Sequence, residues 1–215
     1  MMKKHIVCFG DSNTHGYCAD PKDTETRADR FSENERWTCL LQKALGEEYY
    51  VIEEGLSGRT TVFDDPLHEK MSGLDSIYSC LMSHEPVDLL ILMLGTNDCK
   101  ERFGANAAAI AVGLDRLIQK AKTVPAWSCG KPNILVISPP WMRDGFHDEV
   151  MGLCCVEKSP LLAKYFAPVA KANKCAFLDA EGIAEFNTVD FTHLSRKGHA
   201  QLAEKLAELV PTLLP

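Results

Sequence analysis

Short apolar runs alternate with amphipathic segments along this chain, and this alternation constrains its fold more than any other feature. Runs of about four to eight apolar residues between turn signals are typical of strands buried on both faces of a sheet. Such runs occupy residues 5–9, 49–52, 87–94, 133–138 and 175–178. Because strand and helix patterns alternate, we predict an α/β fold in which helices cover both faces of a parallel sheet.

The segments between these runs carry apolar residues at helical spacing. We expect helices around residues 37–45, 75–84, 110–121, 160–172 and 202–209. Pro168 should kink or end the fourth helix, because proline lacks the amide hydrogen that a helix interior uses. Ser195 is the expected N-cap of the last helix. Three stretches stay irregular, and loops of such length usually serve a function or an interface. They are residues 17–35, 59–72 and 139–159.

Length and charge narrow the classes of protein to which the chain can belong. Its 215 residues, 46% of them hydrophobic, suit a single domain over residues 1–215 with one buried core. The formal net charge of −7 disfavours nucleic acid as a partner, since phosphates need a basic face. The longest apolar run, residues 87–94, contains Asp88 and is far too short to cross a bilayer, so no membrane partner is expected.

The cysteines and the first residues bear on location and on cofactors. The chain has nine cysteines, an odd number, and none of them forms a CxxC pattern. Since HExxH is missing too, we predict neither a metal site nor a cofactor. Residues 1–10 lack a small-residue cleavage site and are interpreted as a first strand rather than a signal peptide. Together with reduced thiols, this predicts a cytoplasmic protein.

A short polar cluster follows each of four predicted strands. The clusters span residues 10–14, 54–58, 95–98 and 190–193. Open α/β sheets bind ligands beyond the carboxyl ends of their strands. Four clusters that are far apart in sequence are therefore expected to meet at one edge of the sheet. This convergence carries more weight than any single motif.

Ser12 is the expected nucleophile. It lies on a sharp turn from strand to helix, flanked by Gly10 and Gly16, which leaves its hydroxyl exposed. A serine hydroxyl becomes reactive when a base takes its proton, and an imidazole held by a carboxylate is such a base. His193 and Asp190, three residues apart before the last helix, can supply both groups. The alternative, a phosphate-binding turn serine, leaves this Asp–His pair without a role.

An oxyanion formed at Ser12 would need hydrogen-bond donors aimed at it. The candidates are the backbone N–H groups of Ser12 and Gly58 and the side-chain amide of Asn97. Glycine suits the second position because it lets a backbone approach a ligand closely. For Asn97 the alternative is a simple turn residue after Gly95, because asparagine favours turns in any case.

The polar blocks also follow a fixed order along the chain. GDS, a glycine in a second loop, GTND and DxxH occur in this order, from residue 10 to residue 193. The order resembles that of the SGNH/GDSL hydrolases. The strings RWTCLLQKALG, VIEEGLSGRTT, DDP, LLILMLGTND and SPP resemble the family's small-ester arylesterase/acyltransferase subgroup, and the similarity covers essentially the whole chain. One departure is Asn13, which stands where the family's name motif has leucine.

The resemblance carries expectations about fold, site and partners. It implies a three-layer α/β/α, flavodoxin-like fold with a central five-stranded parallel sheet and no metal. It implies a triad of Ser12, Asp190 and His193, with Ser12, Gly58 and Asn97 around the oxyanion. It also implies that small acyl groups, often acetyl, move from a small soluble ester to water or to another alcohol. Homo-oligomers are expected on the same ground.

The walls of the substrate pocket are harder to assign. The pocket candidates are Asn13, Ser57, Arg59, Trp141 and Phe146. Ser57 and Arg59 either touch the substrate or hold their loop. Trp141 and Phe146 either line an acyl pocket or lie at a subunit interface, since residues 141–157 show no recognisable family sequence.

The sequence therefore predicts a serine esterase that hydrolyses short-chain, acetyl-type esters through an acyl-enzyme, with acyl transfer to alcohols as a further outcome. A carbohydrate O-acetyl esterase is the nearest alternative, with the same machinery and a sugar-shaped pocket. From a different class, a non-enzymatic flavodoxin-like module would use this fold to bind FMN or a phosphate ligand.

Overall fold

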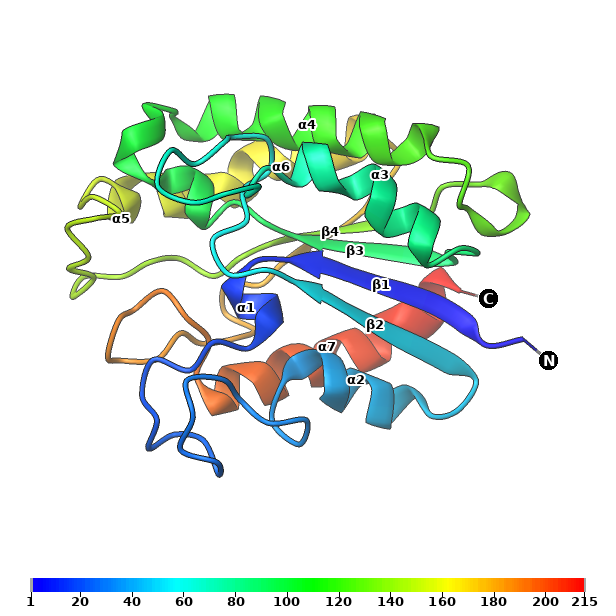
Figure 1. Cartoon of the computed structure of the whole chain (residues 1–215), viewed down its shortest axis with the longest axis horizontal. Helices are drawn as coiled ribbons and strands as arrows, with labels where there is room; N and C mark the ends of the chain where they lie inside the picture. The colour runs from blue at the N-terminus through cyan, green and yellow to red at the C-terminus, as the bar shows by residue number, and fades with distance from the viewer. Residues whose placement is uncertain (1, 215) are drawn as a thin grey trace.

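A five-stranded parallel sheet forms the centre of the molecule (Figure 1). The computed structural model describes residues 2–214. The strands lie in the order β2-β1-β3-β4-β5, and every neighbouring pair is parallel. Their bounds are β1 Lys4–Gly10, β2 Tyr49–Gly55, β3 Leu89–Met93, β4 Ile134–Ser138 and β5 Ala176–Asp179. All five predicted apolar runs are thus strands, and the predicted α/β class with a parallel sheet is confirmed.

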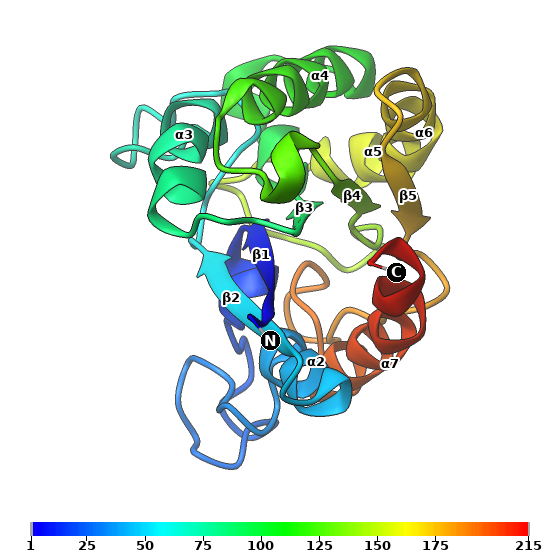
Figure 2. The same cartoon turned by 90° about the vertical axis from the view of Figure 1, so that its right-hand side faces the viewer.

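Helices cover both faces of this sheet, which gives three layers (Figures 1 and 2). Helices α3, α4 and α6 lie on one face and α2 and α7 on the other. The long helices are α2 Trp37–Leu45, α3 Gly73–Ser83, α4 Ala107–Thr123, α6 Leu162–Ala172 and α7 Arg196–Leu213. Single turns are α1 Ser12–His15, α5 Cys155–Lys158, η1 Asn97–Cys99, η2 Glu101–Phe103, η3 Ser128–Gly130 and η4 Ser159–Leu161.

The two-residue period of the strands divides the core between the two helical layers. Val7 and Phe9 of β1 pack with α3 and α4, whereas Ile6 and Cys8 pack with α2 and α7. Successive side chains of a strand point to opposite faces, so an uninterrupted apolar run serves both layers. This explains why β3 and β4 are buried along their whole length, while the edge strand β5 is only partly buried.

Two helix predictions had different outcomes. Ser195 caps α7 as expected, because its side chain accepts a hydrogen bond from the Gly198 amide. The prediction that Pro168 could end its helix is wrong, since α6 runs through it to Ala172. Pro168 lies on the exposed face together with Lys164, whose carbonyl loses its helical partner to the proline and can turn to water instead.

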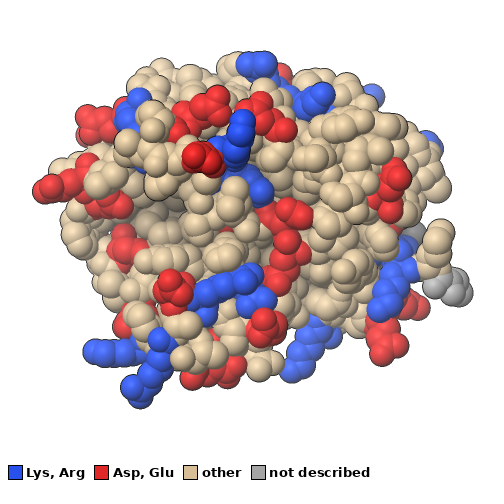
Figure 3. All heavy atoms as spheres, in the orientation of Figure 1, with Lys and Arg blue, Asp and Glu red and all other residues tan. Residues whose placement is uncertain are grey.

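Charged side chains are spread over the surface. On the face seen in Figure 3, acidic and basic side chains are interspersed, as expected for a moderately acidic protein. Within residues 2–214, no helix combines the length and the apolar character that a bilayer crossing requires.

Candidate active site

Ser12 opens a one-turn helix directly after the central strand β1. The carboxylate of Asp11 caps this helix by accepting a hydrogen bond from the Asn13 amide at 2.9 Å. The turn is tight, because a Cβ atom on Gly10 would lie 2.0 Å from the Thr14 hydroxyl oxygen. Gly10 therefore lets α1 fold back against the strand end, which leaves Ser12 at the carboxyl edge of the sheet.

The structure brings Ser12, His193 and Asp190 together in a chain of hydrogen bonds. Nε2 of His193 lies 2.9 Å from the Ser12 hydroxyl oxygen, and Nδ1 lies 2.7 Å from an Asp190 carboxylate oxygen. With its proton on Nδ1, the imidazole donates to the carboxylate and accepts from the serine hydroxyl. Burial raises the pKa of Asp190, but the hydrogen bond and charge of His193 outweigh it and hold the pKa below its usual value.

The loop that carries this Asp–His pair is fixed by Asn187, which sequence reasoning missed. Its side-chain amide donates to the Asp190 carboxylate and to the His193 carbonyl, both at 2.9 Å. Its side-chain oxygen accepts the Asp190 amide at 2.9 Å. Phe191, between the two triad candidates, has a positive φ of 57°. The only available signal in the sequence was an asparagine three residues before an aspartate, a pattern that is also common in ordinary turns.

The three oxyanion candidates line one pocket beside the Ser12 hydroxyl. Ser12, Gly58 and Asn97 all contribute to its wall, together with His193. Gly58 has a φ of 92°, a conformation that favours glycine. Within the described chain, neither the Ser12 nor the Gly58 backbone N–H donates to another residue. The Asn97 amide is held at the wall by the Arg59 carbonyl at 3.2 Å and by an Asp11 carboxylate oxygen at 3.4 Å.

Two buried carboxyl groups, those of Asp11 and Asp98, hold parts of the chain that line the pocket beside Ser12. Burial raises the pKa of Asp11 to about 6, although the bond from the Asn13 amide and the charge of His193 lower it. Burial likewise raises the pKa of Asp98 to about 6, against the hydrogen bonds that it accepts from the hydroxyl and amide of Thr61. Through Thr61, Asp98 holds the loop that contains Gly58.

Two of the five pocket candidates bond to the backbone instead of facing the pocket. The Asn13 side chain donates to the Thr192 carbonyl at 3.2 Å and accepts the Leu194 amide at 2.8 Å. It thereby joins the nucleophile turn to the histidine segment. The buried Arg59 side chain lies over the Phe9 ring, 3.9 Å from its centroid, and donates to the carbonyls of Gly10 and Glu54.

The other three candidates lie in different places. Ser57 lines the pocket that contains Ser12. Phe146 is buried and borders an adjacent hollow next to Asp190 and His193. Trp141 lines a separate pocket, behind the loop that carries the triad candidates.

We call the cavity at Ser12 the Ser12 pocket; its volume is about 430 Å³. Several of its wall residues were not singled out in the sequence. The Tyr17 ring lies 4.5 Å from the His193 ring, centroid to centroid. Lys100 and Arg102 both pair with the buried carboxylate of Asp65, at 3.0 and 2.9 Å. Tyr17 and Met151 come from two of the long loops that the sequence marked as functional or interfacial.

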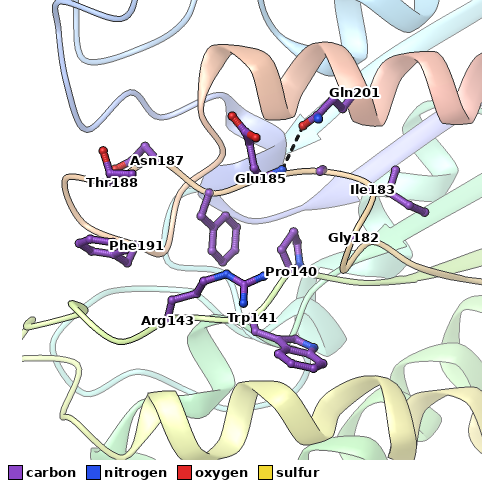
Figure 4. A pocket seen from close by; sticks show the side chains of 12 residues that line it. Pro140, Trp141, Arg143, Gly182, Ile183, Glu185, Asn187, Thr188, Phe191 and Gln201 are labelled. Atoms are coloured by element: carbon purple, nitrogen blue, oxygen red, sulfur yellow. Dashed lines mark hydrogen bonds between the residues drawn. The ribbon is translucent and has the colours of Figure 1, made fainter.

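The second pocket, of about 420 Å³, is lined by Trp141, Arg143 and residues around Phe191 (Figure 4). We call it the Trp141 pocket. Arg143 forms an ion pair with Glu181 and lies over the Trp141 ring. The Phe191 ring packs against Gly145, where a Cβ atom would lie 2.7 Å from it. The Trp141 pocket thus abuts the back of the segment that carries Asp190 and His193.

Known proteins compare closely with this chain over nearly its full length. The sequence pattern of the GDSL-like lipase/acylhydrolase family matches residues 8–201. The chain belongs to this family. The match includes all four polar blocks, so the resemblance to SGNH/GDSL hydrolases is confirmed. Among curated proteins, none matches the sequence.

Solved structures of other GDSL hydrolases share the fold. An aryl esterase from M. smegmatis is 36% identical, with a TM-score of 0.88 over 98% of this chain and 100% of that one. A carbohydrate acetylesterase from Sinorhizobium meliloti is 32% identical, with a TM-score of 0.89 over 98% and 100%. A lipase/acylhydrolase from Enterococcus faecalis, 22% identical, has a TM-score of 0.70 over 99% and 97%. The protein is thus a GDSL-type hydrolase of the esterase/acylhydrolase class with the expected SGNH fold.

Proposed function

We propose that this GDSL hydrolase cleaves short-chain, acetyl-type carboxylic esters through an acyl intermediate on Ser12. The observation that carries the proposal is the continuous series of hydrogen bonds from Asp190 through His193 to the Ser12 hydroxyl. A serine placed in this way can lose its proton to the imidazole as it attacks, while the carboxylate stabilises the imidazolium that forms.

The reaction proceeds in two halves. The Ser12 oxygen attacks the ester carbonyl carbon, and its proton passes to Nε2 of His193. The backbone N–H groups of Ser12 and Gly58 donate to the oxyanion, and the Asn97 amide joins them by giving up its long, 3.4 Å contact with Asp11. The imidazolium then protonates the leaving alcohol, which departs and leaves an acyl-Ser12. Water attacks the acyl carbon with His193 again as base, and the carboxylic acid is released. A second alcohol in place of water would give acyl transfer.

The size of the pocket favours small substrates. At about 430 Å³, the Ser12 pocket has to hold both the acyl group and the alcohol. We expect kcat/KM to fall as the acyl group of an aryl ester lengthens from acetyl to octanoyl. A steady rise along this series would contradict the short-chain assignment.

The nucleophile is tested by an active-site serine phosphonate, followed by peptide mass spectrometry. We expect one adduct per chain, on Ser12, and none on the Ser12→Ala variant. Ser57→Ala is the matched control, because this second serine of the same pocket is not bonded to His193. A folded sample without an adduct would remove the triad and favour the flavodoxin-like binding module.

A carbohydrate O-acetyl ester is the second candidate substrate. It is favoured by the similarity to the S. meliloti carbohydrate acetylesterase and by the polar side chains of Lys100 and Asp148 in the pocket wall. Parallel assays on aryl acetates and acetylated oligosaccharides distinguish the two. A higher kcat/KM for the oligosaccharide would assign the pocket to sugars.

We further propose that the protein forms homo-oligomers. Leu67, Val150 and Leu153 are exposed by 59%, 66% and 60% on the two loops that border the Ser12 pocket. If these side chains form one continuous patch, that patch would be typical of an interaction surface. Light scattering coupled to size-exclusion chromatography measures the assembly, and a monomer at all concentrations would contradict it.

A further inference from the structure

Three side chains with metal-binding atoms meet between strand β2 and helix α3, outside the Ser12 pocket. They are Glu54, near the end of β2, and Cys80 and His84, at the end of α3. One ligand atom from each lies within 4.8 Å of the other two. His84 Nε2 and a Glu54 carboxylate oxygen are 2.6 Å apart. A carboxylate, a thiol and an imidazole therefore face one another across two elements of the fold.

The backbone positions explain why these three side chains converge. Cys80 and His84 are four residues apart, so they lie on the same side of the helix one turn from each other. Glu54 shares its face of the strand with Ile52, which packs in the core beneath α3 and α4. The end of α3 is thus directed at the face of β2 from which Glu54 projects.

The chemistry of this set selects a class of metal. Thiolate, imidazole and carboxylate are the ligands of zinc and of related transition metals, whereas Mg²⁺ and Ca²⁺ prefer sites made of oxygen. We infer that Glu54, Cys80 and His84 form a binding site for a zinc-class divalent metal. Three protein ligands leave one tetrahedral position for water. The sequence predicted no metal because neither CxxC nor HExxH occurs, but here the third ligand comes from a different element of the fold.

The Cys80 sulfur is sheltered from solvent and lies close to the other two ligand atoms. Cys80 is only 8% exposed, and its sulfur lies within 4.8 Å of the ligand atoms of Glu54 and His84. A metal displaces the thiol proton directly, so binding should release a proton. The bound metal would join the edge strand β2 to helix α3 and stabilise the native state by mass action.

Cobalt(II) is a suitable probe, because a thiolate ligand gives it a charge-transfer band in the near ultraviolet and visible ligand-field bands. We expect the full-length protein, stripped with a chelator, to bind one Co²⁺ per chain with these bands, and Zn²⁺ to displace it. Cys80→Ser should abolish the charge-transfer band. His84→Gln should weaken metal binding by about 10- to 100-fold or more. A loss of that size is typical when a residue that only supports a metal ligand is removed, and His84 is itself a ligand.

Cys129→Ser is the matched control, since this exposed cysteine lies in η3, is not among the three ligand residues and should leave the spectrum unchanged. Zn²⁺ should raise the Tm of the wild type and of this control, but not that of Cys80→Ser. Circular dichroism and phosphonate labelling of Ser12 verify the folding of each variant. A wild type without the band, or a band that survives Cys80→Ser, overturns the inference. Since Ser12 labelling is read separately, failure here leaves the proposed esterase intact.

Discussion

The Ser12 pocket and the Trp141 pocket have nearly equal volumes, about 430 and 420 Å³. They lie on either side of the segment 187–193 and share it as a wall. In the Ser12 pocket, a hydroxyl, an imidazole and a carboxylate are in hydrogen-bond contact, with free N–H donors beside them. In the Trp141 pocket, an arginine pairs with a glutamate beside aromatic rings. Volume alone does not locate the chemistry; the mutual geometry of the groups does.

The two pockets nevertheless depend on each other. The Phe191 ring closes the Trp141 pocket, and its backbone joins Asp190 to the histidine segment. We therefore expect the Ser12 pocket to be sensitive to the loss of functional groups and the Trp141 pocket to be sensitive to changes of shape. Substitutions in the two pockets test this distinction.

The largest effect is expected from Asp190→Asn. The asparagine amide would favour the wrong imidazole tautomer, so kcat should fall by about 10⁴-fold while the fold persists. Steady-state kinetics on a short aryl ester measures the loss. The control is Glu181→Gln, which removes the acid of the Arg143 ion pair and should leave kcat unchanged. Similar losses in both variants would contradict the distinction.

Asn97→Ala should lower kcat by about 10²- to 10³-fold, because one donor to the oxyanion is lost. KM should change little, since the amide acts mainly in the transition state. Gln201→Ala removes a side-chain amide from the Trp141 pocket and is the matched control. A loss confined to KM would assign Asn97 to ground-state binding instead.

The pair Gly145→Ala and Gly182→Ala separates the effect of a clash with the Phe191 ring from the effect of backbone strain. Both glycines have positive φ, 112° and 76°, so either alanine should destabilise the fold by about 1 to 3 kcal/mol. A Cβ atom at Gly145 would meet the Phe191 ring at 2.7 Å, whereas nothing lies within 4 Å at Gly182. Only Gly145→Ala should also lower kcat, by up to about 100-fold, by displacing the triad segment. Denaturant unfolding and kinetics measure the two effects, and equal kcat values would show that Phe191 does not transmit the change.

The smallest effect is expected from Trp141→Ala. Its ring lies in the second pocket, so kcat and KM for short aryl esters should stay close to those of the wild type. Kinetics on an acetyl ester is the measurement. A marked rise in KM would mean that the substrate extends into the Trp141 pocket and that the two cavities act as one.

The strands and the segment with Asp190 and His193 could be predicted from the sequence, because strands show an apolar pattern and the segment's place is set by the end of a strand. Apolar runs reported the five strands, and the carboxyl ends of parallel strands have to meet at one edge, which brings Ser12 near His193. The pocket walls followed no such rule. Asn13 and Arg59 bond to backbone carbonyls, and a polar side chain that does so looks the same in a sequence as one that faces a substrate.

The positions of Tyr17 and Lys100 could not be predicted for a related reason. Tyr17 reaches His193 only through the path of an irregular loop. Lys100 enters the wall because Asp65, in another loop, binds its ammonium group. The paths of such loops are set by individual contacts of this kind and not by repeating patterns, so a single sequence carries little information about them.

The hydrogen bond between Ser12 and His193 joins residues 181 positions apart. A ribosome makes the chain from its N-terminus, so the nucleophile emerges long before its base. On the proposed mechanism, a nascent chain carries an ordinary, unactivated serine until His193 has been added. Chains released before residue 193 would therefore be inert toward cellular esters, and the appearance of activity during translation would report that the segment with Asp190 and His193 has been added and has folded.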